Sequence, residues 1–348
     1  MGKTIGHLPV ISEVTVCVSC WSVVFRGFKN YVHSEADFCG CELRGSVRAP
    51  IILAMNSFEA HPDEKHVTIV GVGLIGGSIA AAIRKHLPSC RLTGAGRSES
   101  RLKMACEAGL IDGWTTTFSR ETLHSGGLAI VCLPVDQIAE TIRQLSLLQV
   151  PGAVITDAGS VKSEIYRQLN RFQPVPENYI GSHPIAGGEQ AGFEHARANL
   201  FEEKVCVVTP ENAAEDQVRR VAAFWNRIGS RVFQMTADDH DRILALTSHL
   251  PHVLAVAAAS CVSVDQLVFT GSGFRDTTRI AEGSPEVWTS ILTDNGRHLL
   301  PAIQAAQQVL NRLSAAIETH DSDSLSMMLR QAAELRGMLR VGARTDHQ

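Results

Sequence analysis

The sequence lacks the excess of positive charge that proteins binding nucleic acids carry. Its 36 Asp and Glu residues outnumber its 32 Lys and Arg residues, giving a net charge of −4 at pH 7, and no stretch forms a basic stripe. It also lacks internal repeats and low-complexity tracts. A domain usually takes roughly 100–200 residues, so the 348 residues fit two domains. A chain of this size buries a core without disulfides, and we expect no nucleic-acid partner.

The first residues lack a membrane or targeting signal. The apolar stretch 8–25 is interrupted by Glu13 and is short for a membrane helix, which needs roughly 20 apolar residues. No signal cleavage site of the A-x-A type follows it, and Gly6 stands where a myristoylation motif requires Ser or Thr. We therefore expect a cytoplasmic protein with no membrane partner.

The nine cysteines fall into two groups. Five are scattered through apolar segments, as expected of reduced, buried thiols in an intracellular protein; they are Cys90, Cys106, Cys132, Cys206 and Cys261. The other four form CVSC and CGC within the first fifty residues; they are Cys17, Cys20, Cys39 and Cys41. Two close thiol pairs could bind zinc. Because C-x-C is not the usual spacing and no second motif supports the site, we predict no metal.

Residues 1–64 differ from the rest of the chain because they show no sustained hydrophobic period. Residues 56–64 are polar and typical of a linker, and Met55 directly precedes them. Either Met55 is the true start and the preceding residues come from a misassigned start codon, or the segment is a lineage-specific extension. In both cases we predict that residues 1–64 are poorly ordered.

Strand-like and helical segments alternate from His66 to about Thr236. Short β-branched or apolar runs occupy 66–70, 91–96, 128–134, 153–159, 178–184 and 204–210. This alternation predicts βαβ units and a parallel sheet, whereas the segments after Thr236 are all helical in pattern. We therefore predict an α/β fold, with a Rossmann-type parallel-sheet domain over 65–236 and an all-helical domain over 237–348.

A glycine-rich turn follows the first of these strands and opens a helix. The turn reads Gly-Val-Gly-Leu-Ile-Gly over 71–76, and a G-x-G-x-x-G in this context is the fingerprint of a dinucleotide site. Its glycines permit the tight turn, the approach of the pyrophosphate and close helix–sheet packing, while free helix N–H groups hold the phosphates. A plain glycine-rich turn is the alternative. The predicted cofactor contacts of this turn and of the third strand's end are Gly71, Gly73, Leu74, Ile75, Gly76, Leu133 and Pro134.

The second strand ends without the acidic residue that binds a ribose 2′-hydroxyl in NAD-binding folds. Gly96, Arg97 and Ser98 stand there instead. Gly96 leaves room, Arg97 can pair with a 2′-phosphate and Ser98 can donate a hydrogen bond to it. These residues favour NADP over NAD. Alternatively, Arg97 is a solvated loop residue and the protein accepts either cofactor.

Four further segments carry polar residues that a core does not require: 157–162, 181–187, 248–252 and 271–279. The first two lie at the carboxyl ends of predicted strands, where α/β folds bind ligands. Their GSVK, GSHPIAG, SHLPH and GFRDTTR motifs occur in the order and with the spacing of the prephenate/arogenate dehydrogenase family, which the chain resembles from about His66 to about Arg312.

The resemblance implies an oxidoreductase of tyrosine biosynthesis. Such an enzyme decarboxylates prephenate or arogenate oxidatively, by hydride transfer to NADP or NAD, and gives 4-hydroxyphenylpyruvate or tyrosine. The C-terminal helices resemble the domain through which this family forms homodimers.

The resemblance also assigns site residues. His183 is the catalytic base, a role that imidazole suits near neutral pH. Ser160 hydrogen-bonds near the reacting hydroxyl and the nicotinamide, although it could also cap the following helix. Arg279 pairs with a substrate carboxylate, for which a planar guanidinium is suited; the alternative is a structural ion pair with Asp276 or Glu189.

The SHLPH motif contributes a second histidine, His252. Because Pro251 starts or kinks a helix, His252 is expected near a helix N-terminus, and the resemblance assigns it to the substrate. Arogenate-type members often lack it, so its presence favours prephenate. His240 and Trp288 match positions that line the pocket region, but a core or hinge role is equally open. The remaining predicted substrate contacts are Ser248, Gly271 and Gly273.

Two other functions remain open. Another two-domain NAD(P)-dependent reductase, acting on a hydroxyacid or an imine, would usually rely on a lysine in the helical domain, and the chain has no lysine after Lys204. A non-catalytic dinucleotide-sensing protein would keep the glycine-rich turn but would not need His183, Ser160 and Arg279 together.

Overall fold

The computed structural model describes residues 13–17, 22–26, 53–54, 64–172, 176–188, 190, 192–211 and 213–345. They form two compact units, one of residues 1–241 and 283–291 and one of residues 242–282 and 292–348. Most of the predicted extension 1–64, including Met55 and three of its four cysteines, lies outside the described residues. The domain boundaries predicted from sequence therefore stay predictions, while the units themselves divide after Asp241.

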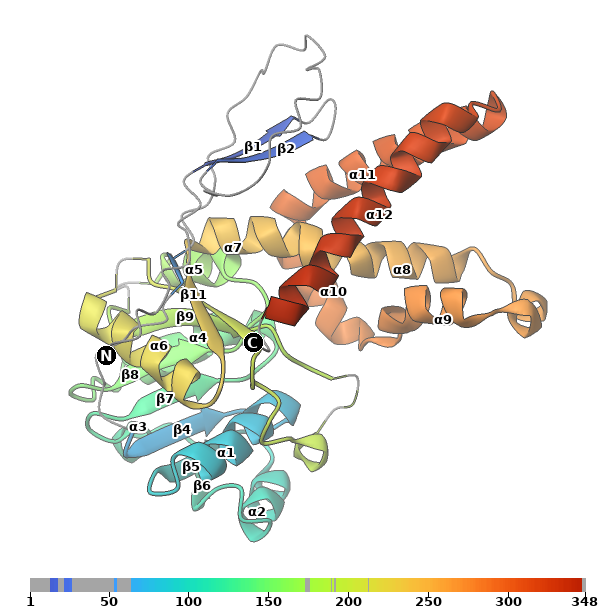
Figure 1. Cartoon of the computed structure of the whole chain (residues 1–348). Coiled ribbons are helices and arrows are strands. Elements are labelled where there is room, and N and C mark those ends of the chain that lie inside the picture. Colours follow the sequence, from blue (N-terminus) through green and yellow to red (C-terminus); the bar gives the residue numbers. More distant parts are fainter. Residues whose placement is uncertain are drawn as a thin grey trace, which may run out of the picture. The chain divides into compact units, whose positions relative to one another are not determined.

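The first unit contains a nine-stranded sheet with the order β3-β11-β10-β9-β8-β7-β4-β5-β6 (Figure 1). Six of these strands are parallel to one another and follow the order of a doubly wound dinucleotide-binding fold. They are β6 (Gly113–Thr115), β5 (Arg91–Ala95), β4 (His66–Val70), β7 (Leu128–Val131), β8 (Val154–Asp157) and β9 (Tyr179–Pro184). The predicted Rossmann-type parallel sheet is confirmed.

Three strands beyond β9 complete the sheet. β10 (Val205–Thr209) runs antiparallel to β9, β11 (Arg231–Gln234) parallel to β10, and β3 (Leu53–Ala54) antiparallel to β11. The sequence did not indicate β3, β6 or β11, which have only two, three and four residues. β3 has only two residues, and β6 and β11 are only partly buried, so they lack the continuous apolar run by which a buried strand is recognised. A separate antiparallel pair joins β1 (Glu13–Cys17) to β2 (Ser22–Arg26).

Helices cover both faces of the sheet. Successive residues of a strand point to opposite sides, and in the buried strands both sets are apolar, so both faces must be covered. In β7, Leu128 and Ile130 belong to one apolar cluster and Ala129 and Val131 to the other. The first cluster packs under α1 (Leu74–His86), α2 (Glu99–Glu107) and α6 (Glu215–Arg227), and the second under α4 (Val135–Ser146) and α5 (Ser163–Leu169). A short helix, α3 (Arg120–Leu123), precedes β7.

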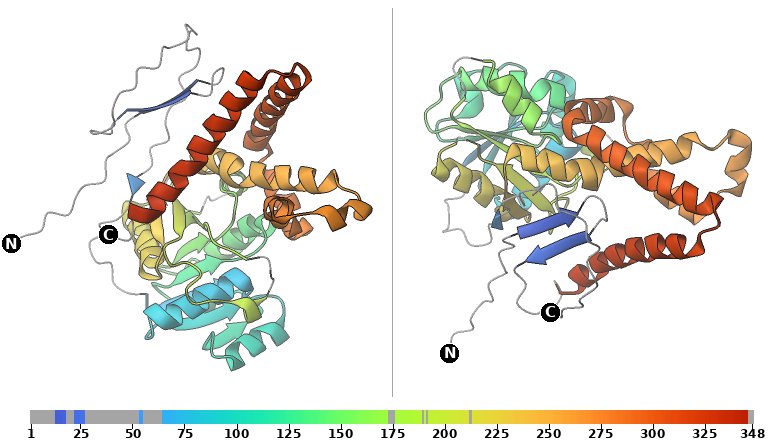
Figure 2. Two further views of the ribbon diagram at one scale, coloured as in Figure 1. Left: turned by 45° about the vertical axis from the view of Figure 1, so that its right-hand side comes forward. Right: turned by 90° about the horizontal axis from the view of Figure 1, so that it is seen from above.

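The described part of the second unit is helical, as predicted. Its elements include α8 (Leu250–Ser260), α9 (Ser272–Thr278), α11 (Gly296–Glu318) and α12 (Ser322–Thr345), and a short turn joins the last two (Figure 2). A π-helical turn, Ala245–His249, precedes α8. The chain enters this unit through α7 (Ala237–Leu244) and re-enters it through α10 (Pro285–Asp294).

One helical stretch, Ala237–Ser260, is long and apolar enough to cross a membrane by length and composition alone. Its most apolar window has a mean hydropathy of 1.5, and 28% of that window is buried within the chain. Core helices of soluble proteins pass the same test, so this property does not by itself indicate a membrane partner.

The described thiols outside the extension are free. Cys90 and Cys206 are buried, Cys106 and Cys132 are half-buried, and Cys261 is exposed. The expectation of burial is therefore wrong for Cys261, because it caps the exposed end of α8 instead of facing a core.

An ion pair joins three segments at the amino ends of the parallel strands. Arg220 of α6 donates from Nε and Nη2 to the two carboxylate oxygens of Glu64, each at 2.6 Å. The same guanidinium donates to the carbonyl groups of Gly126 (2.6 Å) and Gly152 (3.0 Å), which precede β7 and β8. The Arg220 and Glu64 side chains are only 12% and 6% exposed. Arg220 therefore ties the entry to β4 to two neighbouring loops.

We expect Arg220→Met to lower the free energy of unfolding by about 3–5 kcal/mol, since removing one partner of a buried ion pair leaves an uncompensated charge. Urea denaturation of the purified protein measures this loss. The double variant Glu64→Leu/Arg220→Met should recover part of it, because neither charge remains. Arg219→Met is the matched control on the same helix: its partner Glu215 is exposed, and such pairs contribute about 0–1 kcal/mol. Equal losses in the two single variants would contradict this role for Arg220.

Candidate active site

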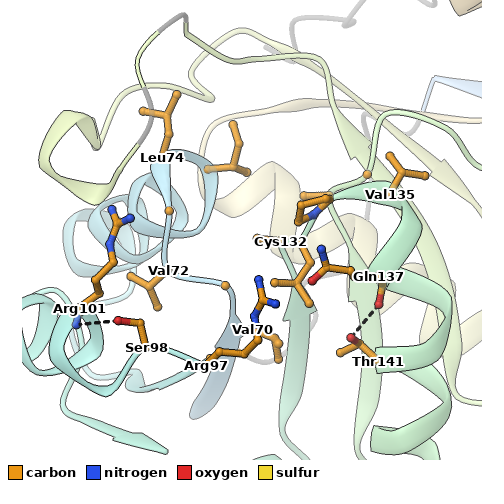
Figure 3. A pocket seen from close by; sticks show the side chains of 18 of the residues that line it. Val70, Val72, Leu74, Arg97, Ser98, Arg101, Cys132, Val135, Gln137 and Thr141 are labelled. Atoms are coloured by element: carbon orange, nitrogen blue, oxygen red, sulfur yellow. Dashed lines mark hydrogen bonds between the residues drawn. The ribbon is translucent and has the colours of Figure 1, made fainter. Parts of the chain in front are cut away.

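The carboxyl ends of the parallel strands border a pocket of about 1110 Å³ (Figure 3). Its walls come from the segments that follow β4, β5, β7 and β8, joined by residues of α4 and α10. Most residues predicted to bind the cofactor line it: Gly71, Gly73, Leu74, Ile75, Arg97, Ser98, Leu133 and Pro134. Ser160 and Cys132 line it as well. The structure thus brings together in one pocket residues that are spread over ninety positions of the sequence.

The glycine-rich turn has the geometry of a phosphate cradle. Gly71 has a φ of +93°, and a Cβ there would lie 2.5 Å from the carbonyl oxygen of Cys132. A Cβ on Gly76 would lie 2.2 Å from the Gly71 oxygen, so this glycine allows α1 to pack against the turn. At Gly73 a Cβ would meet nothing within 4 Å, so a ligand can approach the backbone there. With the free N–H groups of the first turn of α1, these residues fit the pyrophosphate of a dinucleotide.

Two arginines flank the start of α2 at the other end of the pocket. Arg97 and Ser98 follow β5, and the Ser98 hydroxyl accepts a long hydrogen bond (3.5 Å) from the Arg101 N–H. Figure 3 shows this bond beside Arg97. Arg101 also lines the pocket, and its Nη2 lies 3.6 Å from a carboxylate oxygen of Glu194. Sequence reasoning missed Arg101, although its place in the first turn after Ser98 could have indicated it.

His183 is the next-to-last residue of β9, as predicted for a strand end. Its Nδ1 lies 2.8 Å from Nε2 of His240, and Nδ1 of His240 lies 2.7 Å from Oδ1 of Asp241. The three residues are 8%, 0% and 1% exposed. His240, for which a core, hinge or pocket role was open, thus contacts the predicted base directly. No sequence pattern indicated Asp241, because its contact with this group depends on tertiary structure.

Asp241 also caps α5. Its Oδ1 accepts from the backbone N–H of Lys162 (2.9 Å) and its Oδ2 from that of Ser163 (2.8 Å). Burial raises the pKa of the Asp241 carboxyl, but the hydrogen bonds from His240 and from these N–H groups outweigh burial, so its pKa lies below the ordinary value. Burial lowers the pKa of His240, and Asp241 offsets this only partly. Near neutral pH, Asp241 is therefore ionised and His240 is neutral.

The lysine of the GSVK motif lies completely buried beneath the end of β9. Lys162 Nζ forms an ion pair with Asp157 and donates to the carbonyl oxygen of Ser182 at 2.9 Å. The other carboxylate oxygen of Asp157 accepts from the Tyr179 hydroxyl (2.9 Å) and from the Ser182 N–H (3.1 Å). These bonds join the ends of β8 and β9 directly before His183.

Ser160 lies in the loop between β8 and α5. The helix begins at Ser163, and its first N–H groups bond to Asp241. The capping alternative for Ser160 is therefore wrong, because Asp241 performs that task. Its predicted contact with the cofactor and the substrate stays a prediction, consistent with its place on the pocket wall.

The remaining predicted substrate residues lie in the second unit, which is described by itself. Pro251 stands at the start of α8, as expected. His252 follows it, is 3% exposed and hydrogen-bonds to the backbone of Ile280. Burial lowers the pKa of His252, and this bond offsets the effect only partly.

The GFRDTTR motif forms α9 and the turn after it. Arg279 directly follows the helix and is exposed. A Cβ on Gly271 or Gly273 would meet nothing within 4 Å, so packing does not require glycine at either position. Ser248 lies in the π-helical turn. The roles of these residues stay predictions, and Glu189, the alternative partner of Arg279, lies outside the described residues.

Trp288 of α10 is half-buried and packs against the apolar cluster under α4 and α5. Across the described ranges, no three His, Cys, Asp or Glu side chains gather in a way that could hold a metal ion.

Comparison with known proteins agrees with this geometry. The family profile described as the nucleotide-binding domain of prephenate dehydrogenase matches residues 79–234, and that described as its dimerization domain matches residues 236–331. The chain is 31% identical over 292 residues to the cyclohexadienyl dehydrogenase of Zymomonas mobilis, covering 81% of this chain and 97% of that protein.

Two solved structures are similar over most of this chain. The prephenate dehydrogenase of Aquifex aeolicus, in complex with hydroxyphenyl propionate and NAD+, is 28% identical with a TM-score of 0.74, covering 80% of this chain and 100% of that one. The Synechocystis arogenate dehydrogenase is 30% identical with a TM-score of 0.68, covering 79% and 99%. From the two matching domains and these similarities, the chain belongs to the prephenate/arogenate dehydrogenase family.

Proposed function

We propose that the chain is a prephenate or arogenate dehydrogenase, an NAD(P)-dependent oxidoreductase that converts its cyclohexadienol substrate to an aromatic product. The observation that carries the proposal is the buried His183 at the end of β9, the strand beside the one that leads into the dinucleotide pocket. Related proteins support it: one is named a cyclohexadienyl dehydrogenase, and another binds NAD+ together with a hydroxyphenyl acid. The presence of His252 favours prephenate.

The reaction needs a base, a hydride acceptor and a carboxylate-binding group. The Gly71–Gly76 turn would hold the pyrophosphate of the cofactor, which when bound would supply the hydride acceptor. His183 takes the proton of the substrate's ring hydroxyl as hydride leaves the carbon that carries it. The electron pair of the bond to the departing carbon dioxide then completes the aromatic ring. Ser160 hydrogen-bonds near the reacting hydroxyl, and Arg279 binds a substrate carboxylate through its planar guanidinium.

The same proposal includes a homodimer formed through the C-terminal helices. These helices carry apolar side chains that nothing within one described chain covers, as is typical of an interaction surface. Side chains more than half exposed on α11 and α12 include Leu310, Ile317, Leu329, Leu335 and Leu339. A second copy that covers this surface would account for them and for the apolar Ala237–Ser260 stretch.

We further propose that the protein prefers NADP to NAD. No acid follows β5 to bind the ribose hydroxyls and repel a phosphate. Arg97 and the Ser98 hydroxyl stand there instead, and Arg101 adds a second cation on the pocket wall. These side chains are exposed, and exposed pairs contribute only about 0–1 kcal/mol each. The expected preference is therefore clear but not absolute.

The proposed activity is tested by incubating the purified protein with prephenate or arogenate, each with NAD or NADP. Formation of the reduced nicotinamide, followed by its absorbance, is the expected result with at least one pair. Decarboxylation should accompany it in equal amount, because hydride transfer and carbon dioxide loss are coupled in aromatisation. A protein that binds the dinucleotide but reduces it with neither substrate would instead be a sensing module or a reductase of another class.

Replacement of the base should separate turnover from cofactor binding. We expect His183→Asn to lower kcat by about 10²–10⁴-fold, the usual contribution of general base catalysis, and to leave the dissociation constant of the dinucleotide unchanged. Steady-state kinetics and fluorescence titration measure the two quantities. Turnover close to that of the unaltered protein would exclude His183 as the base.

The cofactor preference should depend on Arg97. Arg97→Ala should lower kcat/KM with NADP and leave kcat/KM with NAD nearly unchanged, because only NADP offers a 2′-phosphate to the guanidinium. Lys103→Ala is the control, since Lys103 lies on α2 shortly after Arg97 in the sequence but is not among the residues that line the pocket, and its Nζ lies 4.0 Å from Glu107; it should alter neither value. Equal losses with both cofactors in Arg97→Ala would show that Arg97 supports the loop or the adenine.

A further inference from the structure

A row of hydrogen-bonded side chains runs from the end of β9 to the amino end of α5. His183 Nδ1 and His240 Nε2 are 2.8 Å apart, and His240 Nδ1 and Asp241 Oδ1 are 2.7 Å apart. The neutral form of a histidine ring has one nitrogen that donates and one that accepts. The positions of the protons along the row therefore depend on the group at its end.

Asp241 fixes the first proton. An ionised carboxylate can only accept hydrogen bonds, and Oδ1 of Asp241 already accepts from the Lys162 N–H. His240 must therefore carry its proton on Nδ1 to make the 2.7 Å contact. Because His240 is neutral, its Nε2 then has a lone pair and can only accept.

The position of the second proton, between the two imidazole rings, follows from the position of the first. Since Nε2 of His240 accepts, the proton between the two rings must belong to Nδ1 of His183. The neutral His183 ring then has no proton on Nε2, which is the nitrogen left to act as a base. The hydrogen bond made by one ring nitrogen sets the state of the other.

We propose that His240 and Asp241 are positioning residues that hold His183 in the tautomer with Nδ1 protonated and Nε2 unprotonated, so that the lone pair of Nε2 acts as the base. The aspartate of a Ser-His-Asp triad orients its histidine in the same way, but here a second imidazole lies between the carboxylate and the base. Only the base role of His183 rests on the proposed function; the tautomer follows from the hydrogen bonds together with the charge states of His240 and Asp241.

The hydrogen-bond partners of Asp241, at the far end of the row, bear on how the row responds when His183 gains a proton. Asp241 also accepts from the backbone N–H groups of Lys162 and Ser163, which donate and cannot accept a proton. The nearby charges of Lys162 and Asp157 are paired with each other, so Asp241 is the charge that acts through His240. The row therefore orients His183 and stabilises its protonated form.

Two substitutions of His240 distinguish orientation from packing. His240→Gln places an amide oxygen where Nε2 stood, so the acceptor for His183 Nδ1–H is retained. His240→Leu fills similar space without an acceptor. His66→Leu is the matched control, because His66 lies at the amino end of β4 and stacks on His124, away from this row.

The first readout is the tautomer of His183, observed by NMR of protein made with nitrogen-labelled histidine and identified by the signal that His183→Asn loses. We expect Nδ1 to be protonated in the unaltered protein, in His240→Gln and in His66→Leu. In His240→Leu we expect a mixture of both tautomers. A His183 ring protonated on Nε2 in the unaltered protein would overturn the proposal, whatever the activity of any variant.

The second readout is kinetic. We expect His240→Leu to lower kcat by about 10²-fold or more, within the range of general base catalysis, with KM changed less than threefold, and His240→Gln to recover kcat to within about tenfold. Equal activity of the two variants would also overturn the proposal. Binding of the dinucleotide shows whether each variant folds. If His240→Leu does not fold, the tautomer of His183 in the unaltered protein and in His240→Gln decides whether the proposal holds. Because the tautomer is measured without substrate, failure of the proposed dehydrogenase activity would leave that result intact.

Discussion

A lysine ammonium group with no exposure to solvent must be paired, because an isolated charge in a protein interior costs several kcal/mol or more. Lys162 meets this constraint by bonding to the Asp157 carboxylate and to the Ser182 carbonyl, while its own backbone N–H bonds to Asp241. One residue therefore connects the end of β8, the end of β9, the start of α5 and the middle of α7. The position of His183 depends on all four connections, so the proposed catalytic base is held by the core of the sheet and not by a loop.

The topology of the sheet brings the other residues of the site together. Parallel strands bring their carboxyl ends to one edge, and here the turns after β4, β5, β7 and β8 all border the same pocket. The opposite edge carries the Glu64–Arg220 pair, whose bonds to Gly126 and Gly152 fix the loops that enter β7 and β8. Residues important for stability and residues proposed for function thus occupy opposite ends of the same strands.

Local patterns predicted the parts of the molecule that depend on local structure. The glycine turn over 71–76 is contiguous, and its steric requirements at Gly71 and Gly76 are those expected of the motif. The parallel strands β4, β7, β8 and β9 were recognisable because they are buried on both faces. By contrast, β6 and β11 are short and only partly buried, and the direction of β10 depends on pairing that a sequence does not display.

The His183–His240–Asp241 row shows the limit of prediction from local sequence patterns more clearly. His240 lies 57 positions after His183, and neither it nor Asp241 belongs to a motif that indicates catalysis. Their relation arises only when α7 packs against the end of β9. Arg101 was missed for a different reason: a single exposed arginine on a helix is too common to be informative until the pocket beside it is known.

Cys132 places a sulfur atom on the wall of the dinucleotide pocket. Burial is the main cause that raises its pKa well above that of a free thiol, and burial does the same for Cys90 and Cys206. Oxidants and alkylating reagents attack the thiolate, not the thiol, and these three groups remain protonated under physiological conditions. The Cys132 thiol is therefore a poor nucleophile toward peroxide and disulfides, so a change in the redox state of the surroundings would reach this pocket through the supply of oxidised nicotinamide.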